Sequence, residues 1–120
     1  MKADPSRITH RVSPSERVYL SRERARMTQP QMANRFGLTT DEWREYETGE
    51  KNHPPKHIMV NGRVMNWELM KLWRRRHEWS VKDFAVRIGL SHVTLIHHER
   101  GRGDWTETFT WWERHRNARS

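Results

Sequence analysis

The chain contains GLTTDEWREYETG at residues 37–49 and, 52 positions later, GLSHVTLIHHERG at residues 89–101. Without any gap, the similarity extends back to cover residues 16–49 and 68–101, with ten identical pairs in 34 positions. The identical pairs are Glu16/Glu68, Leu20/Leu72, Arg22/Arg74, Arg24/Arg76, Ala33/Ala85, Arg35/Arg87, Gly37/Gly89, Leu38/Leu90, Glu47/Glu99 and Gly49/Gly101. Similarity at a fixed spacing indicates two copies of one structural unit.

Each copy carries the signals that begin and end three short helices. In the first copy, a Ser or Thr is followed three residues later by Glu or Gln at residues 13–16, 28–31 and 39–42, which is the pattern of a capping box. These signals predict helices over about residues 15–27, from Thr28 to Gly37 and from Thr39 to Gly49. The corresponding signals in the second copy are Asn66, Ser80 and Ser91 before the helices, and Gly89 and Gly101 after them.

Apolar residues recur at helical spacing in both copies, and no stretch has the pattern of a strand. The predicted core residues are Met32, Ala33, Phe36, Leu38, Trp43 and Tyr46 in the first copy, and Phe84, Ala85, Ile88, Leu90, Leu95 and His98 in the second. We therefore predict an all-α fold in which two tandem units pack as one compact protein. The predicted boundaries are residues 13–55 for the first unit, 56–65 for a linker and 66–120 for the second unit. The linker is expected to contain a short packed segment. The second unit includes a last helix over residues 105–117, which follows the capping box Asp104-Trp105-Thr106-Glu107.

The composition indicates an anionic partner. The net charge is +8 and the chain has no cysteine, which excludes disulfides and cysteine-based zinc sites. The charge is uneven, because residues 1–55 carry +2 and residues 56–120 carry +6. Nucleic acid is the first candidate partner for such a balance, although a basic surface can also serve solubility alone. No apolar run approaches the length of a membrane span, and no signal peptide is recognisable, so we expect a cytoplasmic protein.

The repeated motif resembles the Cro/repressor-type (xenobiotic-response-element) helix-turn-helix family, whose pattern reads roughly R, S/T-Q-x-x-[LM]-A-x-x-x-G-[VL]-S/T, an apolar residue and E-x-G. The first copy supplies Arg22, Thr28-Gln29, Met32-Ala33, Gly37-Leu38-Thr39, Trp43 and Glu47-Thr48-Gly49. The second supplies Arg74, Ser80, Phe84-Ala85, Gly89-Leu90-Ser91, Leu95 and Glu99-Arg100-Gly101, and departs at Val81, where the family commonly has Gln. The resemblance covers about 70 of the 120 residues. It implies a lambda-repressor-like fold in which Arg22 pairs with Glu47 and Arg74 with Glu99, as structural contacts.

The resemblance also implies that the third helix of a unit enters the major groove of DNA. In the second unit the candidate base-contacting residues are His92, Val93, Thr94, Ile96 and His97, and the candidate phosphate-contacting residues are Lys82, Ser91, Arg100 and Arg102. An imidazole can donate to guanine or to phosphate, and a valine methyl can contact the methyl group of thymine. Arginines on the phosphates would fix the register of the protein on the duplex.

The third helix of the first unit is acidic, and we interpret this unit as having lost most of its DNA affinity. The carboxylates expected to be exposed, Asp41 and Glu45, and those nearby, Glu42, Glu47 and Glu50, would be repelled by the phosphates. The first-unit residues that remain candidates for DNA contact are Gln29, Thr39, Thr40, Arg44 and Lys51.

These observations predict a sequence-specific double-stranded DNA-binding transcriptional regulator, a small (auto)repressor of the phage or mobile-element type, that reads DNA mainly with residues 91–100. The alternatives are a protein-interaction adaptor or antitoxin-like module that uses the acidic first unit, or an RNA-binding regulator. An enzyme is not expected, since the sequence shows no nucleophile–base pair and no phosphate-binding loop. No cofactor and no small-molecule ligand are evident, and no metal site is expected, because Pro54-Pro55 interrupts the pair His53 and His57.

A homodimer is expected, with either Trp111 and Trp112 or the first unit at the interface. Two chains would then present two reading helices about 34 Å apart, one turn of DNA. A single chain whose two units span two half-sites is the other geometry that the repeat allows.

Overall fold

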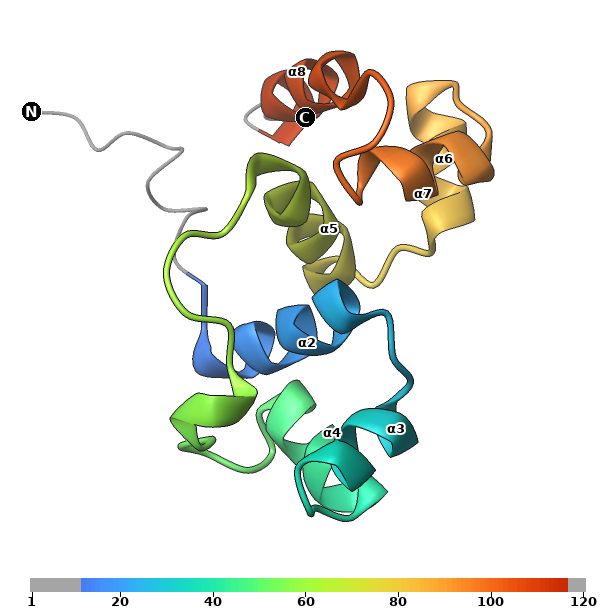
Figure 1. Cartoon of the computed structure of the whole chain (residues 1–120). Coiled ribbons are helices and arrows are strands. Elements are labelled where there is room, and N and C mark those ends of the chain that lie inside the picture. The colour runs from blue at the N-terminus through green and yellow to red at the C-terminus, as the bar shows by residue number, and fades with distance from the viewer. Residues whose placement is uncertain (1–11, 117–120) are drawn as a thin grey trace, which may run out of the picture. The chain divides into compact units, whose positions relative to one another are not determined.

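The computed structural model describes residues 12–116, and every regular element in this range is helical (Figure 1). The predicted all-α class is therefore confirmed for these residues. The described chain divides between Arg63 and Val64 into a first unit, residues 12–63, and a second unit, residues 64–116, which we describe separately. Within the described range, no helix combines the length and the apolar character that crossing a membrane requires.

The first unit begins each of its three α-helices with the predicted capping box. The helices are α2 (Pro14–Ala25), α3 (Gln29–Arg35) and α4 (Thr40–Thr48). The hydroxyl groups of Ser13, Thr28 and Thr39 accept the backbone N–H three residues later, at 3.2, 3.3 and 3.0 Å. The backbone N–H of each cap residue in turn donates to the side-chain oxygen of the Glu or Gln at that position. Each such cap contributes about 1 kcal/mol to helix stability.

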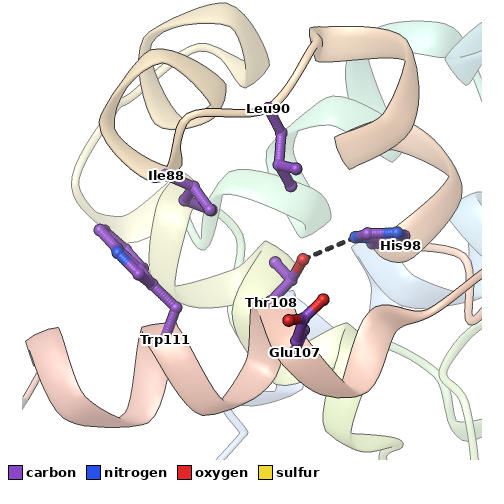
Figure 2. A pocket seen from close by; sticks show the side chains of 6 residues that line it. All are labelled: Ile88, Leu90, His98, Glu107, Thr108 and Trp111. Atoms are coloured by element: carbon purple, nitrogen blue, oxygen red, sulfur yellow. Dashed lines mark hydrogen bonds between the residues drawn. The ribbon is translucent and has the colours of Figure 1, made fainter.

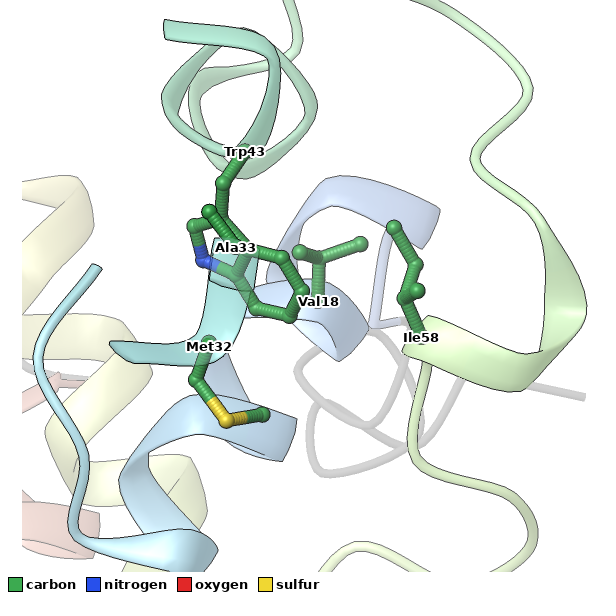
Figure 3. Packing of buried hydrophobic residues seen from close by; sticks show 5 residues of the cluster. All are labelled: Val18, Met32, Ala33, Trp43 and Ile58. Carbon is green, nitrogen blue, oxygen red and sulfur yellow. The ribbon is translucent and has the colours of Figure 1, made fainter. Parts of the chain in front are cut away.

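The core of the first unit is a cluster of five buried side chains, Val18, Met32, Ala33, Trp43 and Ile58, which Figure 3 shows packed together. The ring of Phe36 stacks against Trp43 with centroids 6.0 Å apart. Full burial of a large aliphatic side chain such as Met32 or Ile58 contributes roughly 1.5–3 kcal/mol to the stability of the fold. The small residue at position 33 lets α3 approach the indole closely.

Residues 56–63, which the sequence predicted to be a linker, pack within the first unit. They begin with the short 3-10 helix η1 (Lys56–Ile58), which places Ile58 in the core. The guanidinium of Arg17 donates to the carbonyl oxygens of Val60 and Gly62 at 3.1 and 3.0 Å, and Arg24 donates to that of Arg63 at 3.1 Å. These long-range hydrogen bonds explain why the boundary between the units falls after Arg63.

The second unit consists of α5 (Asn66–Arg76), α6 (Val81–Ile88), α7 (His92–His98) and α8 (Trp105–Arg116). Ser80 and Ser91 cap α6 and α7 as predicted, accepting the N–H of Asp83 at 3.0 Å and of Thr94 at 3.1 Å. The prediction that Asn66 precedes the first of these helices was wrong, because Asn66 is its first residue. Met65 takes the cap position, where its backbone N–H donates to the carboxylate of Glu68 at 2.8 Å. The helix thus begins without a side-chain oxygen at the cap.

Aromatic rings fill much of the second unit and hold α8 against α5. Trp112 is 1 % exposed, and its ring contacts Trp73 at 6.3 Å and Phe109 at 5.2 Å. Its burial leaves Trp112 almost no exposed surface to offer to the predicted dimer interface in the described chain, and dimerisation itself stays a prediction. Trp111 is half-buried. The predicted end of α8 at residue 117 lies outside the described residues.

Candidate nucleic-acid interface

An arginine–glutamate pair joins the first helix of each unit to the end of the third. In the first unit, Arg22 donates to the two carboxylate oxygens of Glu47 at 2.7 and 2.9 Å. In the second unit, Arg74 donates to Glu99 in the same two-pronged way, at 2.8 and 3.0 Å. Both guanidinium groups also donate to a backbone carbonyl five residues later, that of Met27 or of Trp79. This arginine–glutamate ion pair, which we call the brace, therefore holds the third helix to the first in both units.

The brace of the first unit has two further donors. Gln29 donates to Glu47 at 3.2 Å, and the indole N–H of Trp43 donates to it at 2.5 Å. Burial raises the pKa of Glu47, but the hydrogen bonds and the charge of Arg22, with the bonds from Trp43 and Gln29, outweigh burial and leave the pKa below its ordinary value. The hydrogen bond to Glu47 raises the pKa of Arg22. Gln29, predicted as a DNA contact, is thus held by the brace.

In the second unit, α6, a sharp turn and α7 position the candidate reading helix. Gly89 has φ +86°, a left-handed conformation that costs glycine little, and the next N–H donates to the carbonyl of Ala85 at 2.9 Å. On α7, Leu95 and His98 are buried. The opposite face of α7 is consequently turned to solvent.

That face carries His92, Val93 and His97, all of them exposed, with Val93 at 53 %. Two other candidate base contacts, Thr94 and Ile96, are half-buried. The hydroxyl groups of Thr94 and Ser91 hydrogen-bond to each other at 2.8 Å. Of the five predicted base-contacting residues, three therefore lie on the open face.

The loop after α7 adds two exposed arginines, Arg100 and Arg102. The backbone N–H groups of both residues donate to the carbonyl of His97, at 3.1 and 2.8 Å. Between them, Gly101 lies on Trp67, so close that a Cβ atom would be 2.7 Å from the indole carbon Cε2. The indole of Trp67 thus packs directly against the backbone of the loop at Gly101. Neither arginine, nor the exposed Lys82 of α6, forms an ion pair with any residue between 12 and 116.

In the first unit, the two candidate cations lie beside carboxylates. Arg44 is 3.0 Å from Asp41, and Lys51 is 3.9 Å from Glu42. Hydrogen bonds from the backbone and side chain of Thr39 lower the pKa of Glu42, which keeps it ionised at neutral pH. The hydroxyl of Thr39 is in turn used in the cap of α4. The corresponding surface of the first unit is thus acidic, with its cations neutralised locally.

Two exposed residues of α6, Val86 and Arg87, are not among the predicted site residues. Val86 is 79 % exposed, and the guanidinium of Arg87 lies over the ring of Trp79 at 4.2 Å from its centroid. A signal was available in the repeat, since Val86 corresponds to Asn34 in the first copy. The polar Asn34 indicates that this position lies on the surface of the unit, and Val86 is indeed exposed.

Among residues 12–116, no three His, Asp or Glu side chains lie together in a way that could hold a metal ion. Of the pair His53 and His57, the ring of His57 packs against that of Phe36, with the ring centroids 5.7 Å apart. Comparison of the chain with protein-family models, curated proteins and solved structures finds no match.

Proposed function

We propose that the chain is a sequence-specific double-stranded DNA-binding protein of the helix-turn-helix type, with α7 as its reading helix. One observation carries the proposal: from His92 to Arg102, the exposed side chains include cations, imidazoles and a valine, but no carboxylate. The acidic residue in this stretch, Glu99, is 3 % exposed and bound to Arg74. Such a surface can approach phosphates without repulsion.

The dimensions of α7 agree with this use. An α-helix with its side chains is about 10–12 Å across, which fits a major groove about 12 Å wide, and the seven residues of α7 extend about 10 Å along their axis. His92 and His97 can hydrogen-bond to base edges, and Val93 can contact a thymine methyl. Arg100 and Arg102 then bind the phosphates beside the groove.

Three base-contacting side chains read only a few base pairs, so one α7 supplies limited specificity. We therefore propose a homodimer in which two chains each present one α7 to successive turns of the duplex. The acidic first unit does not read DNA in this arrangement. By analogy of fold and size, the biological role is that of a transcriptional repressor.

Selection of bound sequences from random duplex DNA with the full chain tests this function. We expect enrichment of a short motif repeated with two-fold symmetry. If this enrichment is lost in His97→Ala and kept in the first-unit variant Arg44→Ala, then α7 is the helix that recognises the base sequence. Absence of enrichment contradicts the proposal and favours a protein-interaction role for the acidic first unit. Preference for single-stranded or double-stranded RNA over duplex DNA contradicts it in favour of RNA binding.

A further inference from the structure

A cavity of about 250 Å³ lies in the second unit, lined by residues of α6, of the turn before α7, of α7 itself and of α8 (Figure 2). It is lined by Ile88, Leu90, His98, Glu107, Thr108 and Trp111. A cavity of about 150 Å³ is enough to hold benzene, so this one has room for a ring and a short side arm. Its size suits a small organic molecule and exceeds what one or two water molecules need.

Most of the lining is apolar and held in place. Ile88 ends α6, Leu90 lies in the turn before α7, and Trp111 projects from α8 (Figure 2). The indole of Trp111 stacks on His115 with centroids 3.8 Å apart and meets Phe84 edge to face at 5.9 Å. These contacts fix the indole, so this wall of the cavity exists before any ligand binds, which lowers the cost of binding.

The polar part of the lining is made of one bonded pair and one charge. His98 Nδ1 and Thr108 Oγ1 are 2.6 Å apart, and both residues are buried, so they satisfy each other. Glu107 is exposed at the edge of the cavity and forms no hydrogen bond or ion pair with another of the described residues. Glu107 is the one carboxylate of the lining.

We propose that this cavity binds a small organic ammonium ion. Its apolar body, about one ring in size, lies against Ile88, Leu90 and Trp111, and its ammonium group pairs with Glu107. The negative charge of Glu107 disfavours a carboxylate or phosphate ligand, and the aliphatic side chains of Ile88 and Leu90 disfavour a sugar or a bare metal ion. The proposal goes beyond DNA binding and does not depend on it.

Titration of the ¹⁵N-labelled full chain with phenethylamine, followed by NMR, tests the site. We expect saturating shifts at the amides of Leu90 and Thr108 and at the indole N–H of Trp111, identified by its absence in Trp111→Phe. For a ligand of this size the dissociation constant should be on the order of 1 mM. Phenylacetate, of similar shape and opposite charge, should bind more weakly.

The variant Glu107→Gln separates recognition of charge from simple filling of the cavity. It should weaken phenethylamine binding about two- to fivefold, as expected for an exposed ion pair, and should not weaken phenylacetate binding. The control Glu78→Gln removes the same charge from an exposed residue that does not line the cavity, and should change neither. Shifts that stay linear with concentration, shifts centred elsewhere, or equal affinity of wild type and Glu107→Gln overturn the proposal. No DNA is present, so the outcome is independent of the proposed DNA-binding function.

Discussion

The substitution Glu47→Gln tests whether the arginine–glutamate brace holds the first unit together. Glu47 is 2 % exposed and accepts four hydrogen bonds, two of them from Arg22 and one each from Gln29 and Trp43. Glutamine keeps the shape of the side chain, but it removes the charge and turns an NH2 group toward these donors. Breaking a buried ion pair from one side costs about 3–5 kcal/mol. Because the Arg22 side chain keeps 18 % exposure, we expect the lower end, about 3 kcal/mol.

That loss is large for a unit of this size. At about 0.05–0.15 kcal/mol per residue, residues 12–63 have a stability of roughly 3–8 kcal/mol. Native-state hydrogen exchange at the Leu38 amide, which donates to the carbonyl of Ala33 at 2.8 Å, reports on this unit. A loss of 3 kcal/mol lowers its protection about 150-fold.

The control is Glu45→Gln, which removes the same charge from a half-buried residue of the same helix. Its effect should stay within about 0.5 kcal/mol. Protection at Leu38 that falls by the same factor in both variants would refute the reasoning, because the brace would then contribute no more than a surface carboxylate.

Further predictions concern acid stability, DNA binding and the loop after α7. Since the pKa of Glu47 is lowered in the folded protein, its contribution is full above the unfolded value of about 4.3 and is lost as the pH falls through the folded pKa. Protection of the first unit should therefore drop below about pH 4, and this drop should be smaller in Glu47→Gln. His97→Ala should weaken binding to the selected sequence by about 1–3 kcal/mol in fluorescence anisotropy, with binding to unrelated duplexes unchanged; equal loss on both would assign His97 to the backbone. Arg102→Ala should weaken binding to all duplexes and reduce the salt slope by about 0.9, and an unchanged slope would remove Arg102 from the phosphates. Gly101→Ala should lower the melting temperature more than Gly62→Ala. Both residues have positive φ, but of the two only Gly101 would bring its Cβ against a neighbouring side chain, that of Trp67. Equal changes in melting temperature would mean that the Trp67 indole moves aside at no cost in stability.

The sequence predicted those features that depend on neighbouring residues. The capping boxes at Ser13, Thr28 and Thr39 each connect two residues three positions apart, so their geometry follows from the local sequence. The prediction that Asn66 caps α5 failed because the cap needs no polar side chain of its own. The carboxylate of Glu68, three residues later, accepts the backbone N–H of Met65 at the cap. The pairing of arginine with glutamate came from the family resemblance, since nothing local links residues 25 positions apart.

Contacts between distant residues were the part that could not be predicted. The packing of Ile58 into the first core depends on the tertiary position of a segment that follows all three helices. The burial of Trp112 likewise depends on where α8 lies against Trp73, and an aromatic-rich helix gives no sign of which ring faces inward. For the candidate interface, the sequence located the stretch from His92 to Arg102, but only the structure separates its open residues from the half-buried Thr94 and Ile96.

The proposed difference in DNA binding between the two units rests on the charge of the third helix, and the local ion pairs contribute little to it. Arg44 and Asp41 are 52 % and 74 % exposed, and an exposed pair contributes at most about 1 kcal/mol, so a phosphate could displace the carboxylate at small cost. The decisive cost is that the displaced carboxylate stays within the same helix, beside Glu42 and Glu45, and meets the phosphates there. In the second unit the one carboxylate between His92 and Arg102, that of Glu99, is buried against Arg74. Under the proposed DNA-binding function, freeing the cations of the first unit would therefore not make it a reader of DNA, whereas the exposed charges from His92 to Arg102 in the second unit would need no rearrangement.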